Sequence, residues 1–166
     1  TSYLTIEPQG AIPLEFRQAI GNRIYGCDDC QLICPWNKFA KLSTVEDFQV
    51  RNQLDDISLL ELFSWSEDTF LNSLQGSPIR RIGFQSWQRN IAVALGNAPY
   101  QLAIVEALTS SLVSANDFVA EHIAWAITQQ QNKKALSITE AEQSQKNHRL
   151  TLRLTRSIEK GLPRDA

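Results

Sequence analysis

The chain has 166 residues, of which 43% are hydrophobic and 20% are charged, an ordinary composition for a globular protein with one core or two small ones. It contains no apolar run of about 18 residues, so we expect no transmembrane helix. The net charge of −2 alone says nothing about nucleic acid, but residues 46–68 are strongly acidic and residues 132–166 are basic. Two interpretations of this basic tail stay open, a solvated or frayed segment and a helix that touches RNA.

Residues 1–40 are rich in proline and glycine, which predicts a lobe made largely of loops. The alternation of apolar and polar residues over 2–6 predicts a strand. Pro13 to Ile20 is expected to form a short helix, since proline suits the first helical position and Gly21 follows the last apolar residue. These elements suit the second half of a small ferredoxin-like lobe.

The cysteines of the chain, Cys27, Cys30 and Cys34, are spaced C-x2-C-x3-C and are followed by Pro35. This spacing equals the last three positions of the cysteine run that binds [4Fe–4S] clusters in bacterial ferredoxins. Ile24 stands where the first cysteine of that run would be. A cluster needs four thiolates, so the remaining ligands lie outside this chain or no cluster forms.

Three other interpretations of the cysteines remain. A zinc site would need a second pair of ligands, and His122 and His148 have no ligand spacing. A thioredoxin-like redox pair would need a βαβ pattern around it, which the sequence lacks. Inert buried cysteines are the third interpretation. The spacing favours an iron–sulfur motif over each of these, and Trp36 would then cover the cluster.

From residue 43 onward the pattern is helical. Capping boxes begin at Ser43 and Ser58, and the pair Ser77-Pro78 opens a further helix that Gly83 ends. Apolar residues then recur on one helical face at 84, 87, 91, 94 and 95, and further helices are expected after Pro99 and from Asp117, with Asp117 as the cap. The sequence therefore predicts a mainly α fold, with a lobe at 1–40, a HEAT-like helical domain at 41–131 and a basic, partly disordered tail at 132–166.

A group of basic residues, Arg80, Arg81 and Arg89, lies in a stretch with no acid between Asp68 and Glu106. Arginines at a helix start can bind phosphate. They could equally form ion pairs with the acidic segment at 46–68. Trp125 is expected in the core, although a stacking role beside His122 is conceivable.

Three stretches of the chain carry a family resemblance. They are SYLTIEPQGAIPLEFRQAIGNRIYGCDDCQLICPWNKFA at 2–40, GSPIRRIGFQSWQRNIAVALGN at 76–97 and VAEHIAWAI at 119–127. These motifs resemble epoxyqueuosine reductase, the cobalamin- and iron–sulfur-dependent oxidoreductase that reduces epoxyqueuosine to queuosine in tRNA. The resemblance covers about residues 1–130.

The resemblance implies a C-terminal fragment that is inactive alone, with a further cysteine just before it and the cobalamin domain and catalytic acid upstream. It implies two [4Fe–4S] clusters that relay electrons to cobalamin. Cys27 and Cys30 would then bind the nearer cluster, and Cys34 the second one, by the ferredoxin crossover. No catalytic residue is expected in this chain.

The resemblance also implies binding residues. Ser2 and the segment Cys27-Asp28 match positions beside cobalamin. Gln9 stands where relatives often carry a lysine near tRNA, and Arg80 and Arg81 are expected to contact the tRNA. The whole protein would be a cytoplasmic monomer, without a membrane segment, served by an external electron donor. A second function class stays open, namely a HEAT-like adaptor with a structural zinc knob and no redox role.

Overall fold

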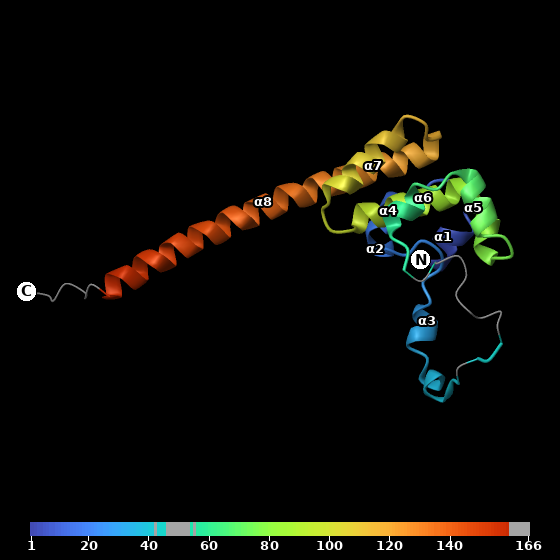
Figure 1. Cartoon of the computed structure of the whole chain (residues 1–166), viewed down its shortest axis with the longest axis horizontal. Coiled ribbons are helices and arrows are strands. Elements are labelled where there is room, and N and C mark those ends of the chain that lie inside the picture. Colours follow the sequence, from blue (N-terminus) through green and yellow to red (C-terminus); the bar gives the residue numbers. More distant parts are fainter. Residues whose placement is uncertain (42, 46–53, 55, 160–166) are drawn as a thin grey trace, which may run out of the picture. The chain divides into compact units, whose positions relative to one another are not determined.

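The computed structural model describes residues 1–41, 43–45, 54 and 56–159, and within them every regular element is a helix. The chain divides into unit 1, Thr1–Gln130, and unit 2, Gln131–Ala166. Unit 1 holds α1 (Ser2–Ile6), α2 (Leu14–Ile20), α3 (Asp29–Leu32), η1 (Pro35–Phe39), α4 (Leu59–Phe63), α5 (Glu67–Ser73), η3 (Pro78–Ile82), α6 (Gly83–Asn97), α7 (Leu102–Leu112) and the first part of α8 (Asp117–Glu159) (Figure 1). The mainly α prediction is confirmed.

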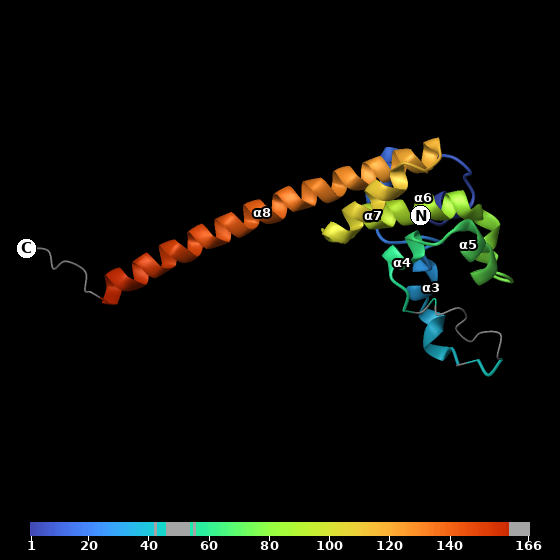
Figure 2. The same ribbon diagram turned by 45° about the horizontal axis from the view of Figure 1, so that its top comes forward.

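Helix α6 is the centre of unit 1. It contacts α1, α2, α4, α5 and η3, and ten of its fifteen residues are buried, so it is enclosed on nearly all sides. Two views of the ribbon show α6 among these elements (Figures 1 and 2). Enclosure of this kind makes α6 the scaffold on which both the N-terminal segment and the later helices are assembled.

The larger core cluster joins one face of α6 to the helices that follow and precede it. Trp87 is fully buried and lies 6.1 Å from the ring of Trp65 and 5.7 Å from that of Phe70. Other buried members are Leu62, Phe63, Leu74, Ile82, Ile91, Leu95, Ile104, Leu108, Val119 and Ile123. Each fully buried apolar side chain of this size contributes about 1.5–3 kcal/mol, so this cluster is the main source of stability in unit 1.

Several predicted helix boundaries are confirmed. The hydroxyl of Ser58 accepts the Glu61 amide at 3.1 Å, and Ser77 caps η3. Gly83 ends η3 with a φ of +77°, a conformation that favours glycine. The cap of α8 is a correction, because Asn116, and not Asp117, accepts the Val119 amide at 3.0 Å. Part of the capping box at residue 43 lies outside the described residues.

The strand predicted over residues 2–6 is wrong, because these residues form helix α1. The Thr5 amide donates to the Thr1 carbonyl at 3.1 Å, and the Thr5 hydroxyl lies 3.1 Å from the Ser2 carbonyl. Local bonds of this kind offer a short segment an alternative to a sheet ladder. Contact with α6 then decides the outcome for five residues whose alternation alone suits a strand.

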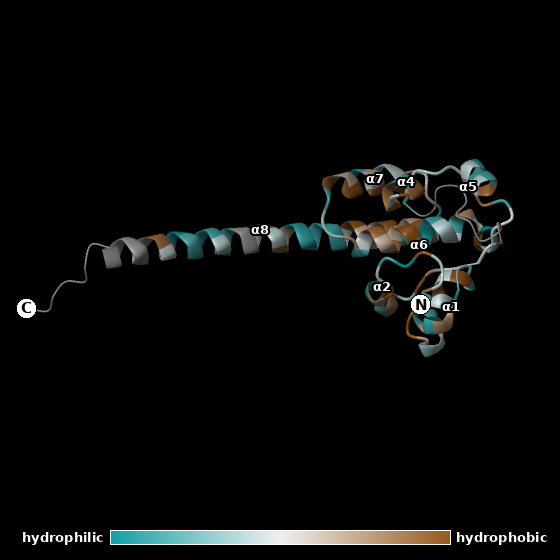
Figure 3. Ribbon diagram, turned by 60° about the horizontal axis from the view of Figure 1, so that its bottom comes forward, coloured by the Kyte–Doolittle hydropathy of each residue, from teal (hydrophilic) through white to brown (hydrophobic). Residues whose placement is uncertain are grey.

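Unit 2 is described as helix up to residue 159, where α8 ends. Its apolar side chains Leu136, Ile138, Leu150 and Leu152 are exposed. In the hydropathy colouring α8 is largely teal and white with a few brown bands, whereas brown dominates much of α6 and α7 (Figure 3). Acidic Glu142 precedes basic Lys146 by four residues, a spacing that favours an isolated helix. Among the described residues, no helix is long and apolar enough to cross a membrane.

Candidate functional site

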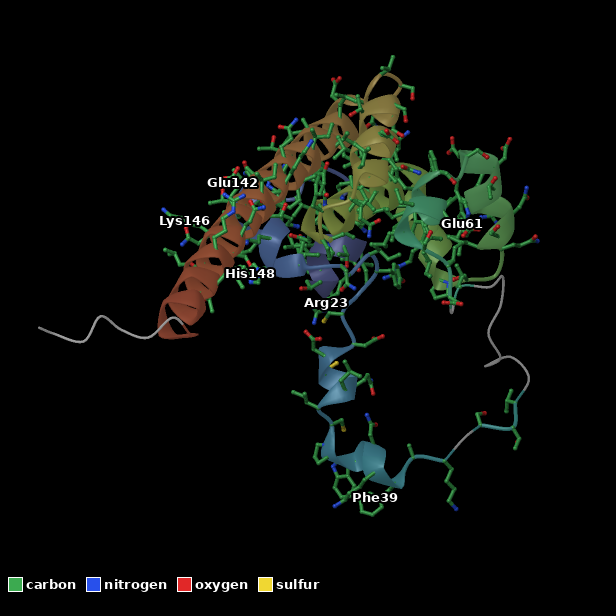
Figure 4. The ribbon with its side chains drawn as sticks, turned by 60° about the vertical axis from the view of Figure 1, so that its left-hand side comes forward. Arg23, Phe39, Glu61, Glu142, Lys146 and His148 are labelled. Carbon is green, nitrogen blue, oxygen red and sulfur yellow. The ribbon has the colours of Figure 1, made fainter. Side chains whose placement is uncertain are left out.

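The predicted cysteines lie on one excursion of the chain, residues 26–39, here called the cysteine segment. It begins with two left-handed residues, Gly26 at φ +66° and Asp28 at φ +51°, on either side of Cys27. Helix α3 follows, and η1 begins directly after Cys34 at Pro35. Figure 4 shows the segment between the labelled Arg23 and Phe39, with sulfur atoms in yellow along it. Cys27 lies in the left-handed turn, Cys30 lies in α3, and Cys34 lies directly before η1.

The three thiols are free of disulfides; Cys30 is exposed, and Cys27 and Cys34 are partly buried. Within the described part of the chain, no three His, Cys, Asp or Glu side chains are gathered in a way that could hold a metal ion. Three thiolates are the donor type that iron–sulfur clusters use, but they are one short of the four ligands of a single cluster. The donor set therefore fits a cluster whose coordination is completed from elsewhere.

Local bonds hold the first part of the cysteine segment. Backbone amides of Gln31 and Leu32 donate to the Asp28 carbonyl at 2.8 and 2.9 Å. Asn37 donates through its side-chain amide to the Gln31 carbonyl and so ties η1 to α3. Arg23 forms an exposed ion pair with Asp29 at 2.8 Å. Exposed pairs contribute little, so the helical turns carry most of this local order.

Large apolar side chains of the cysteine segment face solvent. Leu32, Ile33, Trp36 and Phe39 are 63–82% exposed, and the Trp36 and Phe39 rings lie 5.8 Å apart. Single exposed apolar residues are common, but a run of them beside reactive thiols is typical of a surface that becomes covered. Cluster ligation by these cysteines would use the same surface.

Helix α6 holds the N-terminal segment through the hydrogen bonds of a buried arginine. Arg89, which is 0% exposed, donates to the carbonyls of Pro8, Gly10 and Leu4 at 2.8, 2.5 and 3.2 Å. Burial lowers its pKa to about 10, so it stays charged at neutral pH. The prediction that Arg89 belongs to a phosphate-binding surface is therefore wrong, because its side chain is buried and bonds backbone carbonyls.

Two asparagines of α6 also form hydrogen bonds to the N-terminal segment. The Asn90 amide donates to the carbonyls of Thr5 and Ile24 at 2.7 and 2.8 Å. The Asn97 amide donates to the carbonyls of Arg17 and Gly21 at 2.8 and 2.9 Å. Carbonyl groups that α1, α2 and their loops leave without helical partners are thereby satisfied, as buried polar groups require.

Helix α8 supplies the remaining anchor. His122 is fully buried, accepts the Ile12 amide on Nε2 at 3.0 Å, and contacts the Phe118 carbonyl through Nδ1 at 2.5 Å. Arg17 donates to the Ile12 carbonyl at 2.8 Å and to Glu121. The hydrogen bond from Arg17 lowers the pKa of Glu121. His122 is thus a structural residue, and the conceivable base-stacking role beside Trp125 is not open to it.

The structure brings together two of the residues expected beside cobalamin. A Cβ placed on Gly26 would lie 3.9 Å from the hydroxyl of Ser2, and Gly26 directly precedes Cys27. Ser2 and Asp28 are both exposed. Ser2 therefore lies beside the turn that directly precedes Cys27.

The ion pair of Arg81 with Glu7 brings two of the residues expected to contact tRNA, Arg81 and Gln9, into one region. Arg81 forms an exposed ion pair with Glu7 at 3.3 Å, and Gln9 lies between the two carbonyls, of Pro8 and Gly10, that Arg89 holds. Arg80 and Gln9 are exposed. The partner of Arg81 is therefore Glu7; the acidic segment at 46–68 lies partly outside the described residues.

Sequence reasoning missed Thr5, Asn90 and Asn97. Ser86, Arg89, Asn90, Val93 and Asn97 share a face of α6, opposite the apolar face at 84, 87, 91 and 95. Polar residues on a second helical face usually indicate solvent exposure, but here Arg89, Asn90 and Asn97 donate hydrogen bonds to backbone carbonyls. The signal was the absence of lysine and glutamate from that face, since long charged residues mark exposed positions.

The chain is similar in sequence to known proteins. Residues 1–37 match the family model of the 4Fe-4S double cluster binding domain. The chain is 56% identical over 165 residues to the epoxyqueuosine reductase of Escherichia coli strain K12, an alignment that covers 99% of this chain and 42% of that protein. The enzyme of the same name from Vibrio cholerae is 52% identical over the same shares. The predicted resemblance to epoxyqueuosine reductase is confirmed.

Solved structures of epoxyqueuosine reductase are similar in fold. The enzyme from Bacillus subtilis is 29% identical with a TM-score of 0.69, over 77% of this chain and 34% of that one. An epoxyqueuosine reductase crystallised with an epoxyqueuosine-modified tRNA-Tyr stem loop is 25% identical with a TM-score of 0.56, over 78% and 43%. The chain spans about 42% of the length of the curated relatives it matches.

Proposed function

We propose that this chain is the C-terminal part of an epoxyqueuosine reductase and that the whole protein reduces epoxyqueuosine to queuosine in tRNA. The observation that carries the proposal is 56% identity over 99% of the chain to an epoxyqueuosine reductase. The cysteine spacing and the match of residues 1–37 to a double-cluster domain support it independently. The alternative, an adaptor with a zinc knob, is not favoured by these relatives.

The proposed cluster ligands are the three cysteines of the chain. Cys27 and Cys30 would bind one [4Fe–4S] cluster and Cys34 the other, with the remaining thiolates supplied from outside these 166 residues. When bound, the clusters would carry electrons toward cobalamin, which would supply the reducing metal. The left-handed turn at Gly26 and Asp28 presents Cys27, and α3 carries Cys30.

The remaining roles are those that the family resemblance implies. Ser2, Cys27 and Asp28 would contact cobalamin, and the position of Ser2 beside the turn before Cys27 supports a shared site. Residues 1–40 would form the ferredoxin-like lobe, residues 41–131 a HEAT-like domain and residues 132–166 a basic tail. We place the whole protein in the cytoplasm as a monomer with an external electron donor.

The proposed docking face for tRNA carries Gln9, Arg80 and Arg81. All three are exposed, and the ion pair with Glu7 holds Arg81 on the same side as the Gln9 loop. Arg89 fixes that loop from inside by its bonds on either side of Gln9. Exposed guanidinium groups bind phosphate well.

The test uses the full-length protein, purified and reconstituted without oxygen. The proposal expects iron and sulfide in the protein, visible charge-transfer absorption, and turnover of epoxyqueuosine-tRNA. Cys30→Ser should lose iron and turnover, whereas Gln31→Ser, at an exposed neighbouring position, should retain both. Zinc without iron in the native protein, or a fully active Cys30→Ser, would refute the proposal.

A further inference from the structure

We propose that Asn90 is a positioning residue that sets the place of the Cys27 thiol through the two backbone segments that its amide joins. The inference goes beyond the general holding of the N-terminal segment by α6. It rests on the proposed function, in which Cys27 is a cluster ligand.

The Asn90 side chain is fully committed as a donor. It is 1% exposed, and its Nδ2 donates to the carbonyl of Thr5 in α1 and to that of Ile24, at 2.7 and 2.8 Å. An amide group has two N–H donors, so neither is left over. Because the Asn90 amide is buried, water has little access to it, and α1 and Ile24 are held to one point on α6.

Thr5 closes the arrangement from the other side. It is 0% exposed, and its hydroxyl accepts the backbone amide of Gly26 at 3.0 Å. Thr5 thus bonds Asn90 through its carbonyl and Gly26 through its side chain. Gly26 is left-handed, at φ +66°, and is joined by one peptide bond to Cys27. The turn at residues 24–26 is therefore held at both ends, directly before the first thiol.

Ile24 and Tyr25 of this turn also pack, partly buried, against the larger core cluster, whereas its other polar contacts are exposed. Arg23 and Asp29 form an exposed ion pair, and the Tyr25 hydroxyl lies 3.4 Å from the Pro78 carbonyl on the surface. Exposed contacts of this kind contribute little. Apolar packing is not directional, so the bonds of Asn90 and Thr5 fix the backbone position from which the cysteine segment leaves the body of unit 1. Groups that orient a ligand in this way also tune the bound metal.

Helix α6 offers a matched control. Asn97 is the same residue type on the same helix, and its Nδ2 also donates to two carbonyls, at 2.8 and 2.9 Å. Its partners are Arg17 and Gly21, which end α2 and do not adjoin a cysteine. Loss of Asn97 should cost similar stability without releasing the turn before Cys27.

The experiment compares Asn90→Leu, Thr5→Val, Thr5→Ser and Asn97→Leu in the full-length protein. One readout is the rate at which iodoacetamide alkylates Cys27 relative to Cys30 in the metal-free protein, measured by mass spectrometry. The other is the electron paramagnetic resonance spectrum of the reconstituted, reduced protein. Thr5→Val keeps the shape of the side chain, so it remains informative where Asn90→Leu fails to fold.

We expect Asn90→Leu and Thr5→Val to raise the alkylation ratio several-fold and to alter the spectrum. Asn97→Leu should leave both unchanged, and Thr5→Ser, which keeps the hydroxyl, should behave like the wild type. An unchanged ratio in Thr5→Val, or an equal rise in Asn97→Leu, would overturn the inference. A wild-type protein without iron and sulfide would refute the proposed function instead, and the alkylation ratio would still decide the role of Asn90.

Discussion

The Nε2 atom of His122 accepts the backbone amide of Ile12 at 3.0 Å, a bond between residues 110 positions apart in the sequence. Since the amide can only donate, Nε2 must be unprotonated, and the proton of the neutral ring lies on Nδ1, facing the Phe118 carbonyl at 2.5 Å. Burial lowers the pKa of His122, and the hydrogen bond to the Phe118 carbonyl opposes this by a smaller amount. The N-terminal segment is thus fastened to α8 by a group that titrates.

Stability should therefore fall in mild acid. Below about pH 6.5 the unfolded chain binds a proton at His122 that the folded protein resists, so the free energy of unfolding decreases as pH falls, by up to about 1.4 kcal/mol per pH unit until the lowered pKa is reached. Urea unfolding between pH 7.5 and 5.5 measures this slope. The contribution is fully present above pH 6.5.

The two histidines give a control for this pH dependence. His122→Gln should be less stable at neutral pH and should flatten the slope. His148 is exposed on α8, so His148→Gln should leave both the midpoint and the slope as in the wild type. Equal slopes in all three proteins would show that another group is responsible.

Gly96 marks a close approach of α6 to α8. A Cβ at this position would lie 2.6 Å from the Trp125 ring and 2.9 Å from the backbone Cα of Ala126. We expect Gly96→Ala to lower the free energy of unfolding by about 1–3 kcal/mol, because the Ala126 backbone cannot yield as a flexible side chain would. Gly10→Ala is the control, since nothing lies within 4 Å of its Cβ. Equal midpoints in thermal unfolding would contradict this packing.

Arg89 and Arg81 should differ sharply in their effect on stability. Arg89→Leu removes a fully buried guanidinium and leaves the carbonyls of Leu4, Pro8 and Gly10 without their donor, so we expect a loss of about 3 kcal/mol. Arg81→Leu removes only an exposed ion pair with Glu7, so a change within about 1 kcal/mol is expected. Denaturant unfolding compares the two. A small effect of Arg89→Leu would mean that the loop it holds adds little to folding.

Prediction from sequence worked where the chemistry is local. The structure confirms the predicted ends of two helices. Ser58 and Ser77 begin helices by side-chain capping, and Gly83 ends η3 because it has no side chain. Cysteine spacing likewise indicated a cluster motif without any knowledge of the fold. Such signals depend on residues a few positions apart, so a single sequence contains them in full.

Prediction failed where the decisive contact is distant. Residues 2–6 form a helix that packs against α6. Arg89 is internal because it bonds the carbonyls of Pro8 and Gly10, which are 81 and 79 positions away in the sequence. Neither partner is visible in a local pattern. Asn90 was missed for the same reason, as its two carbonyl acceptors are 85 and 66 residues away.

Serine substitutions at two cysteines should damage different clusters. Under the proposed ferredoxin crossover, Cys34 would belong to the cluster whose other ligands lie outside this chain, whereas Cys27 would share a cluster with Cys30. In the full-length protein we expect Cys27→Ser and Cys34→Ser each to remove a distinct paramagnetic signal from the reduced spectrum, with Gln31→Ser as the unaffected control. If both serine variants lose the same signal, the assignment of Cys34 is wrong.

Arg80→Ala combined with Arg81→Ala should weaken tRNA binding and leave the iron content unchanged. Each lost phosphate contact should reduce the slope of log K against log[salt] by roughly 0.7–0.9. Thermal stability should stay the same, because both side chains are exposed and only the pair with Glu7 is lost. Binding of a modified anticodon stem loop over a salt series gives the slope.

The control removes two exposed cations from α8, Lys146 and Arg149. Both double variants lose two positive charges, so the non-specific electrostatic attraction to tRNA should fall by the same amount in each. Only a docking face at η3 would make the Arg80 and Arg81 variant bind more weakly than the control. An unchanged slope with a lowered melting temperature would make Arg80 and Arg81 structural residues. A larger slope change in the Lys146 and Arg149 variant would move the RNA contact to the basic helix, because the salt dependence follows the phosphates actually neutralised.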